Sequence, residues 1–294
     1  MAGQKITLIG VGLLGGSLGL AIKAAGLASH VTGFVRRESS VAECLKYGVV
    51  DSATTSLAAA AEGASLIIFC TPLGQMSELA ADLAPHVSKG TIVTDVGSVK
   101  GSVVRDLEPL FAKTGAFFLG SHPMAGSEKS GVTAARADLF KNAVCVITPT
   151  SKTGRTTTDT VHNFWKKIGC RLLTLTPDLH DEFVSRSSHL PHVVAAELAN
   201  YVLSPAHAKE QAMLCANGFR DSTRIAAGSP EMWRDISMAN RKSLARVLGV
   251  FIEDLQEFQL ALETPDEKAI QEFFMNAKER RDKWSAQVVS TSPE

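Results

Sequence analysis

A histidine set among small residues is the feature of this 294-residue chain that is best suited to chemistry. It is His122, within the stretch Gly-Ser-His-Pro-Met-Ala-Gly that covers residues 120–126. An imidazole has an ordinary pKa of about 6.5, so it can accept a proton near neutral pH, as a general base must. We predict that His122 is a catalytic base. The alternative is a structural histidine whose hydrogen bonds are all satisfied.

Two segments of the second half carry groups that could contact a substrate. His189 and His192 lie three residues apart around a proline. They could bind a metal, cap a helix or contact a substrate; no third ligand at metal-site spacing accompanies them, so we predict no metal and favour substrate binding. Farther on, Arg224 could hold a carboxylate with Asp221 orienting its neighbours, or the two could belong to a salt bridge at a helix end.

A glycine-rich loop near the N-terminus predicts a dinucleotide site. It has the pattern G-x-G-x-x-G between an apolar strand and a helix, and a second strand follows the helix. Gly10 allows a tight turn, Gly12 lets the backbone approach a pyrophosphate, and Gly15 lets helix and strand pack closely. The loop, with Leu13 and Leu14 inside it, is expected to place the pyrophosphate at the helix N-terminus. A merely flexible turn is the alternative.

The end of the second strand indicates which dinucleotide the loop would hold. Cofactor sites for NAD usually place Asp or Glu there, to bind the ribose 2′-hydroxyl. Val35 occupies that place, and Arg36, Arg37 and Ser39 follow it. Arginine binds phosphate through charge-assisted bonds, so these residues favour NADP over NAD. In the alternative, the arginines are solvated and Glu38 still reaches the ribose.

The elements that must position these groups alternate between strand and helix in the first half. Apolar strand-like runs recur at residues 5–9, 31–35, 66–70, 91–95, 116–120, 143–147 and 171–175. This alternation predicts an α/β fold with a doubly wound, mostly parallel sheet, whose ligands bind outside the carboxyl ends of the strands. Because Thr71, Ser98 and His122 each follow a strand, we expect them to converge on one crevice.

The second half has the periodicity of helices. Helical patterns are expected at residues 180–200, 207–217, 237–262 and 266–286. We therefore predict two domains, a nucleotide-binding domain at residues 1–176 and an all-α domain at residues 177–294. The apolar stripe from Val247 to Leu262 is expected to be core or the seam of a dimer.

The composition excludes several classes of protein. Lys+Arg and Asp+Glu both number 30, so no net field favours nucleic acid or an anionic membrane. The five cysteines are scattered and include no C-x-x-C pair, which indicates reduced thiols rather than a disulfide framework or zinc site. No apolar run reaches the roughly 18 residues of a membrane span. We expect a cytoplasmic enzyme that binds a small molecule.

Five motifs together resemble the prephenate/arogenate dehydrogenases, oxidoreductases of tyrosine biosynthesis. The resemblance covers roughly residues 5–285 and is carried by GVGLLGGSLG, DVGSVKG, GSHPMAGSEKSG, SHLPH, and FRDSTRIA with MWRDI. It implies a Rossmann-type domain, a helical domain that forms a homodimer, and an active site between them. The implied reaction is oxidative decarboxylation of a cyclohexadienyl substrate, prephenate or arogenate, with hydride transfer to NADP or NAD.

The resemblance also implies roles for single residues. It makes His122 the base that takes the ring-hydroxyl proton, while Ser98 binds that hydroxyl or orients the histidine. It implies that Arg224 and His192 bind the substrate carboxylate and that Glu128 lies at the entrance near Arg224. Thr71 and the glycine loop would line the cofactor.

Other classes stay open at this point. β-Hydroxyacid and 6-phosphogluconate dehydrogenases share the glycine loop, but they depend on a lysine motif of the second domain that this chain does not show. A redox sensor that binds NADP(H) without turnover would need neither a base nor a carboxylate grip. The choice between prephenate and arogenate is also open. We expect no appended regulatory domain, so that any feedback by tyrosine would act at the active site.

Overall fold

The computed structural model describes residues 4–127, 129–204 and 208–290. Contacts divide the chain into one unit that ends at Leu244 and a second that begins at Ala245. All candidate site residues lie in the first unit. The predicted domain boundary at residues 176 and 177 falls inside that unit and stays a prediction.

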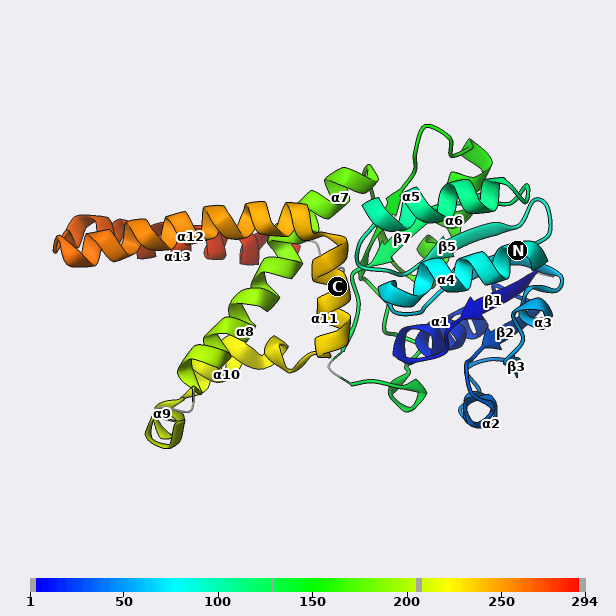
Figure 1. Ribbon diagram of the computed structural model, residues 1–294, viewed down its shortest axis with the longest axis horizontal. Coiled ribbons are helices and arrows are strands. Elements are labelled where there is room, and N and C mark those ends of the chain that lie inside the picture. Colours follow the sequence, from blue (N-terminus) through cyan, green and yellow to red (C-terminus); the bar gives the residue numbers. More distant parts are fainter. Residues whose placement is uncertain (1–3, 128, 205–207, 291–294) are drawn as a thin grey trace. The chain divides into compact units, whose positions relative to one another are not determined.

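The main sheet has six parallel strands in the order β3-β2-β1-β4-β5-β6 (Figure 1). The strands are β1 (Lys5–Ile9), β2 (His30–Phe34), β3 (Ser52–Thr54), β4 (Ala64–Phe69), β5 (Ile92–Asp95) and β6 (Phe117–Phe118). The chain winds outward from β1 in one direction and then, from β4, in the other. This confirms the predicted doubly wound sheet, and it puts the topological switch point beside the carboxyl end of β1.

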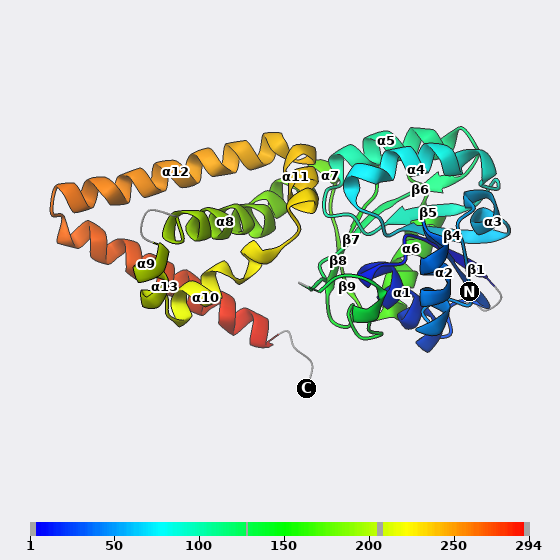
Figure 2. The same ribbon diagram turned by 60° about the horizontal axis from the view of Figure 1, so that its bottom comes forward.

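Helices cover both faces of this sheet, α4 and α5 on one side and α1 and α6 on the other (Figure 2). They are α1 (Leu13–Ala24), α2 (Glu38–Lys46), α3 (Leu57–Ala61), α4 (Leu73–Leu83), α5 (Gly101–Ala112) and α6 (Arg155–Ile168). Side chains alternate along β4: Leu66 and Ile68 join the core beneath α1 and α6, whereas Ile67 and Phe69 join the core beneath α3, α4 and α5. A strand buried on both faces therefore reads as one continuous apolar run.

A second, three-stranded sheet departs from the prediction. After β6 the chain leaves the main sheet, and β7 (Gly120–Pro123) pairs antiparallel with β8 (Val144–Thr148), which pairs in parallel with β9 (Arg171–Thr174). His122 therefore lies within a strand, opposite Val146, rather than after one. The absent side chain of Gly120 allows this approach, because a Cβ there would lie 2.6 Å from Thr148 Oγ1.

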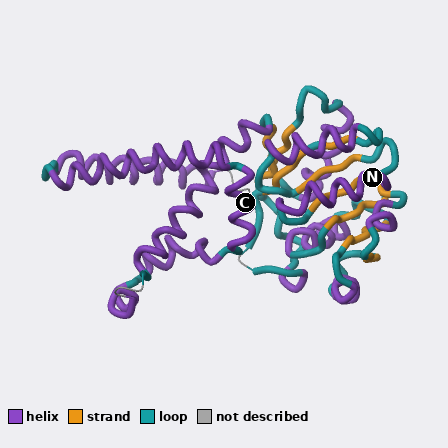
Figure 3. Tube along the Cα trace, viewed as in Figure 1, coloured by secondary structure: helices purple, strands orange, loops and turns teal. Residues whose placement is uncertain are grey.

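Beyond β9 the regular elements that the structure describes are all helices, joined by short loops, as Figure 3 shows. The elements are α7 (Pro177–Val184), a π-helical turn (Ser185–His189), α8 (Leu190–Val202), α9 (Ala208–Leu214), α10 (Asn217–Thr223), a 3-10 turn (Arg224–Ala227), α11 (Pro230–Ala239), α12 (Arg241–Glu263) and α13 (Glu267–Ser290). The all-α expectation for this half is confirmed. None of the described helices is both long enough and apolar enough to cross a membrane.

Two predicted helices are wrong in detail. The helix expected at residues 180–200 starts earlier and contains the π-helical turn, because Pro191 has no N–H to donate within the α-helical pattern. The helix expected at residues 237–262 is broken at Asn240, whose side chain serves the site described below. Helix α10 and most of α11 were not predicted.

Candidate active site

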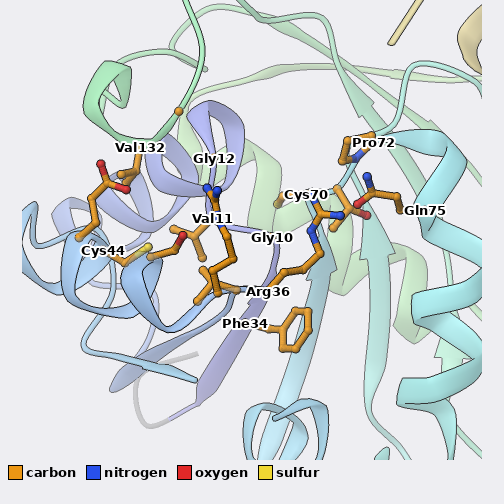
Figure 4. A pocket seen from close by; sticks show the side chains of 16 residues that line it. Gly10, Val11, Gly12, Phe34, Arg36, Cys44, Cys70, Pro72, Gln75 and Val132 are labelled. Carbon is orange, nitrogen blue, oxygen red and sulfur yellow. The ribbon is translucent and has the colours of Figure 1, made fainter. Parts of the chain in front are cut away.

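A cavity of about 270 Å³ lies at the carboxyl ends of β1, β2 and β4 (Figure 4). Its lining comprises Gly10, Val11, Gly12, Phe34, Val35, Arg36, Arg37, Ser40, Glu43, Cys44, Cys70, Thr71, Pro72, Gln75, Gly131 and Val132. In the view of Figure 4, Arg36 and Gln75 lie on one side of the cavity, with Cys44 and Val132 on the other. The cavity thus occupies the switch point, where doubly wound folds bind their ligands.

The three glycines of the loop serve different ends. Gly10 has φ +95°, which favours glycine, and a Cβ on Gly15 would lie 2.0 Å from the Gly10 carbonyl oxygen. Both are therefore required by the fold itself. A Cβ on Gly12 would meet no described atom within 4 Å, although Gly12 lines the cavity. The space beside Gly12 is thus available to a ligand.

Thr71 supplies an independent sign that the cavity binds a polar molecule. Its hydroxyl is buried, and within the described residues it has no hydrogen-bond partner. Its methyl group lies against Gly10, at 2.8 Å from where a Cβ on that glycine would stand. Buried polar groups are nearly always satisfied, so a ligand or water must bind this hydroxyl. The residues present fit a nicotinamide dinucleotide.

Two arginines lie at the end of β2, beside the cavity. Val35, Arg36 and Arg37 line the cavity. Glu38 is not among the lining residues, and its carboxylate accepts a hydrogen bond from Thr55 Oγ1 at 2.5 Å. The orientation of the Glu38 side chain therefore does not support the alternative in which Glu38 binds a ribose.

Four of the predicted cofactor residues do not line the cavity, and Gly15, which packs against the Gly10 carbonyl, is one of them. Leu13 and Leu14 begin α1 and pack against the core. Ser39 is exposed on α2, and the next residue, Ser40, lines the cavity instead. For these four residues the predicted cofactor contact stays a prediction.

His122 ends a chain of hydrogen-bonded side chains. Its Nδ1 lies 2.8 Å from His180 Nε2, and His180 Nδ1 lies 2.8 Å from Asp181 Oδ1. The Asp181 carboxylate accepts hydrogen bonds from the backbone N–H of Lys100 at 2.7 Å and of Gly101 at 2.8 Å. The chain is thereby anchored to the N-terminus of α5.

A buried ion pair holds the residue next to His122. Lys100 Nζ is paired with Asp95, and both side chains are fully buried. Lys100 also donates to the Ser121 carbonyl oxygen at 2.9 Å, and Asp95 Oδ1 accepts from the Ser121 N–H at 3.1 Å. Since Asp95 ends β5 and Ser121 lies in β7, the pair joins the two sheets beside the histidine.

The surroundings of His122 keep it neutral. Burial, followed by His180, Lys100 and His189, holds its pKa well below the ordinary histidine value. A neutral imidazole has a lone pair at neutral pH, which the proposed base requires. Asp95, the partner of Lys100, also adds to the burial that raises the pKa of Cys70, a residue of the cavity lining.

A second group of side chains lies around His189. Its Nδ1 is 3.3 Å from Asn240 Nδ2, and Asn240 also donates to the Asp181 carbonyl oxygen at 2.8 Å. Burial lowers the pKa of His189 to about 4. His189 Nε2 and Trp233 Nε1 are buried and have no hydrogen-bond partner among the described residues. Such atoms indicate a place for water or a ligand.

His192 joins this group through Trp233. The two rings stack with centroids 3.8 Å apart, and His192 Nδ1 lies 3.2 Å from the Ile225 carbonyl oxygen, to which it donates. Burial and then Arg224 lower the pKa of His192, the carbonyl acting in the opposite direction. The structure therefore brings together His192 and Arg224, as the sequence predicts.

The remaining predicted residues are placed less centrally. Ser98 lies half-buried in the turn between β5 and α5, where its backbone carbonyl acts on His189 and raises the pKa of that ring. Asp221 is exposed on α10. Glu128 lies outside the described residues. Within the described part of the chain, no group of three or more His, Cys, Asp or Glu side chains could hold a metal.

The residues that support the histidines were not predicted from the sequence. These are Asp95, Lys100, His180, Asp181, Trp233 and Asn240. Two of them had a local signal, since His180 and Asp181 are adjacent titratable residues just after the helix start at Thr176. Their partners could not be foreseen, because His180 meets His122 across 58 positions of sequence.

The chain matches known proteins over nearly its whole length. The nucleotide-binding domain of prephenate dehydrogenase matches residues 18–174, and the dimerization domain of prephenate dehydrogenase matches residues 176–276. A prephenate dehydrogenase of Bacillus subtilis (strain 168) is 35% identical over 285 residues, which are 95% of this chain and 76% of that protein. A cyclohexadienyl dehydrogenase of Zymomonas mobilis is 32% identical over 280 residues, 95% of each chain.

A solved structure agrees with these matches. The crystal structure of prephenate dehydrogenase from Aquifex aeolicus, in complex with hydroxyphenyl propionate and NAD+, is 30% identical and superimposes with a TM-score of 0.90. The superposition covers 96% of this chain and 99% of that one. The chain therefore belongs to the prephenate dehydrogenase family of NAD(P)-dependent oxidoreductases.

Proposed function

We propose that this protein oxidatively decarboxylates prephenate, arogenate or both, with hydride transfer to NADP. The products are 4-hydroxyphenylpyruvate or tyrosine, together with CO2. The observation that carries the proposal is the buried, neutral His122, whose Nδ1 lies 2.8 Å from His180 Nε2. Relatives that are prephenate and cyclohexadienyl dehydrogenases support the same reaction class.

His122 acts on the ring hydroxyl of the substrate. Its lone pair takes the hydroxyl proton as a hydride leaves the same carbon, and the loss of CO2 makes the ring aromatic. The nicotinamide, when bound, supplies the acceptor for that hydride. Ser98 binds the hydroxyl or orients His122. The chain's own task is to position the ring and to hold one proton acceptor neutral.

Arg224 and His192 bind the carboxylate of the substrate in this proposal. Their proximity supports this role, and an arginine binds carboxylate through paired, charge-assisted bonds. His189 contacts the substrate in this proposal, which is supported by its buried Nε2, an atom without a side-chain partner among the described residues. Asp221 would orient a neighbouring base or arginine, and the family resemblance assigns Glu128, which lies outside the described residues, to the entrance. These last two roles rest on the sequence alone.

The preference for NADP rests on the end of β2. Arg36 and Arg37 line the cavity, Val35 holds the place of an acidic ribose ligand, and Glu38 is bonded to Thr55. The Aquifex aeolicus relative was solved with NAD+, so the family accommodates that cofactor too. An arginine pair without a nearby ribose carboxylate favours the phosphorylated form.

The helices of the second unit form a homodimer in this proposal. Residues 176–276 match a dimerization domain. Apolar side chains stay exposed on α12 and α13, namely Val250, Ile252, Leu255, Leu260, Leu262, Phe273, Phe274, Met275 and Trp284. A single chain that leaves so many large apolar groups in water has an interaction surface.

The test is an assay of both substrates against both cofactors, followed at 340 nm. We expect turnover with at least one substrate and a higher kcat/KM with NADP than with NAD. His122→Asn should reduce kcat by about 100-fold or more while cofactor affinity stays near that of the wild type. Tight cofactor binding without turnover of either substrate would contradict the proposed function and would favour a redox sensor instead.

A further inference from the structure

We propose that His180 is a positioning residue, which holds His122 in the tautomer that carries its proton on Nδ1 and leaves Nε2 as the proton acceptor. This inference rests on the proposed function in that it takes His122 to be the base. It is built on the buried chain His122–His180–Asp181 and on the direction in which each hydrogen bond must run.

The direction is set at Asp181. Its Oδ1 accepts the Lys100 N–H at 2.7 Å and its Oδ2 accepts the Gly101 N–H at 2.8 Å. A backbone N–H can only donate, so both carboxylate oxygens act as acceptors. These N–H groups begin α5, where the partial positive charge of a helix N-terminus favours an anionic side chain.

The direction then passes along the two imidazoles. His180 Nδ1 lies 2.8 Å from Asp181 Oδ1 and must carry a proton to donate to it. Burial lowers the pKa of His180, and a neutral ring has one proton, so His180 Nε2 is an acceptor. That atom lies 2.8 Å from His122 Nδ1, which must therefore be the donor. The single proton of neutral His122 is thus on Nδ1.

The other tautomer of His122 is disfavoured by the same geometry. With its proton on Nε2, His122 would bring a lone pair on Nδ1 against the lone pair of His180 Nε2, at the same 2.8 Å. Both rings are buried, so water could not relieve this contact. The hydrogen bond made by one ring nitrogen determines which nitrogen is free to react.

The groups around the pair support a neutral resting state. Lys100 and His189 act on His122 in addition to His180, and all of them oppose a positive charge there. Asp181 and Asp95 act on His180 in the opposite direction to Lys100 and to burial. During the reaction the substrate O–H bond breaks and an N–H bond forms at His122 Nε2. The imidazolium that results is stabilised through His180 by the Asp181 carboxylate.

Histidine tautomers in the free protein can be read by two-bond 1H–15N NMR of 15N-labelled full-length chain, with His122→Asn assigning the signals. We expect His122 to have a protonated Nδ1 and an unprotonated Nε2. A wild-type His122 that carries its proton on Nε2 would overturn the inference, whatever the activity assays give. This readout needs no substrate, so it is independent of the proposed reaction.

Three substitutions at His180 separate positioning from packing. His180→Gln places an amide oxygen near the former Nε2 and keeps an acceptor for His122, whereas His180→Asn keeps only a donor for Asp181 and His180→Phe keeps neither. We expect kcat to fall by about 100-fold in the Asn and Phe variants and by less than about 10-fold in the Gln variant, with KM and cofactor affinity little changed. Equal losses in the Gln and Phe variants, with wild-type melting temperatures, would assign His180 a packing role.

The failures of the two proposals are distinguishable. If wild-type protein turns over neither substrate, the proposed function fails, and the NMR measurement still decides the tautomer. If His122→Asn is inactive but His180→Phe retains wild-type kcat, His122 stays the base and the positioning role of His180 is refuted.

Discussion

At the scale of single residues, the site is a set of histidines kept neutral by burial. His122, His180 and His189 all have lowered pKa values, and in each case burial is the largest cause. Neutral rings can donate with one nitrogen and accept with the other, so each can link two partners. The cost is that these rings resist protonation, which makes the folded state sensitive to acid.

His189 should make the stability of the protein pH-dependent. Its pKa is about 4 in the folded protein and about 6.5 when unfolded, so protons bind the unfolded chain preferentially between these values. The contribution of neutral His189 to the free energy of unfolding is fully present above about pH 6.5. It is lost as the pH falls toward 4, and the total loss is on the order of 3 kcal/mol. Urea unfolding at pH 7.5 and 4.5 should show a smaller difference for His189→Gln than for the wild type.

The matched control is His86→Gln, at an exposed histidine of the same unit. It should leave the pH dependence of unfolding as it is in the wild type. An unchanged pH dependence in His189→Gln would mean that the ring is not held neutral by the fold.

Arg36 should discriminate between the two cofactors. Charge-assisted hydrogen bonds to phosphate contribute about 1.5–3 kcal/mol, which corresponds to roughly 10- to 100-fold in affinity. We expect Arg36→Ala to weaken NADP binding by that factor and NAD binding by less than about 3-fold, measured by fluorescence or calorimetric titration. Lys46→Ala, at an exposed cation outside the cavity lining, is the control. Equal losses of affinity for both cofactors would contradict a role of Arg36 in binding the 2′-phosphate and would favour Glu38 as the ligand of the ribose.

At the scale of elements, strand ends and helix starts do the positioning. The N-terminus of α5 binds Asp181 of α7, and the end of β5 binds Ser121 of β7. The start of α4 contributes Pro72 and Gln75 to the cofactor cavity, and a Cβ on its Gly74 would lie 2.4 Å from Asp235 of α11. One helix therefore contacts both the cavity and the helical segment that carries Trp233.

The turn from β1 into α1 offers a matched pair of substitutions. Gly15→Ala puts a methyl group 2.0 Å from the Gly10 carbonyl oxygen, so it should destabilise the protein by about 1–3 kcal/mol. Gly12→Ala meets no described atom, so it should change stability by less than about 0.5 kcal/mol while weakening cofactor binding by at least about 10-fold. Thermal unfolding and cofactor titration check both. If Gly12→Ala retained full cofactor affinity, the prediction that this loop binds the pyrophosphate would be contradicted.

At the scale of the whole molecule, exposed apolar side chains on α12 and α13 require a partner surface. In the second unit the rings of Phe258 and Phe273 pack with centroids 4.5 Å apart, which fixes the pairing of the two helices. Large apolar groups remain exposed along both of them. The proposed homodimer would cover these groups.

Light scattering of the wild type should therefore give twice the chain mass of 31.3 kDa. Leu260→Arg places a charge on the exposed apolar surface and should shift the mass toward that of one chain at micromolar concentration. Leu45→Arg makes the same change at an exposed leucine of α2 and should leave the mass unchanged. A dimer that tolerates Leu260→Arg but not Leu45→Arg would place the interface elsewhere.

The sequence alone was sufficient for features that depend on local pattern. Strand periodicity and the glycine loop predicted the parallel sheet and the place of the cofactor cavity, because burial on both faces and a positive φ at Gly10 leave direct marks on residue types. The histidine-containing motifs indicated the family, which the comparisons then showed. The family resemblance also assigned His192 and Arg224 to one site, and in the structure Arg224 lies near enough to lower the pKa of His192.

Only the tertiary structure decided how His122 is held. The prediction that it follows a strand was wrong, since it lies within β7, in a sheet that local pattern does not separate from the first. Its partners come from α7 and the turn before α5, and Asn240 reaches the same network from the break between α11 and α12. Hydrogen bonds between residues far apart in sequence depend on how the elements pack, and no spacing along one chain encodes them. His122 was visible in the sequence, but the nitrogen that we propose as its proton acceptor follows from the direction of hydrogen bonds that only folding creates.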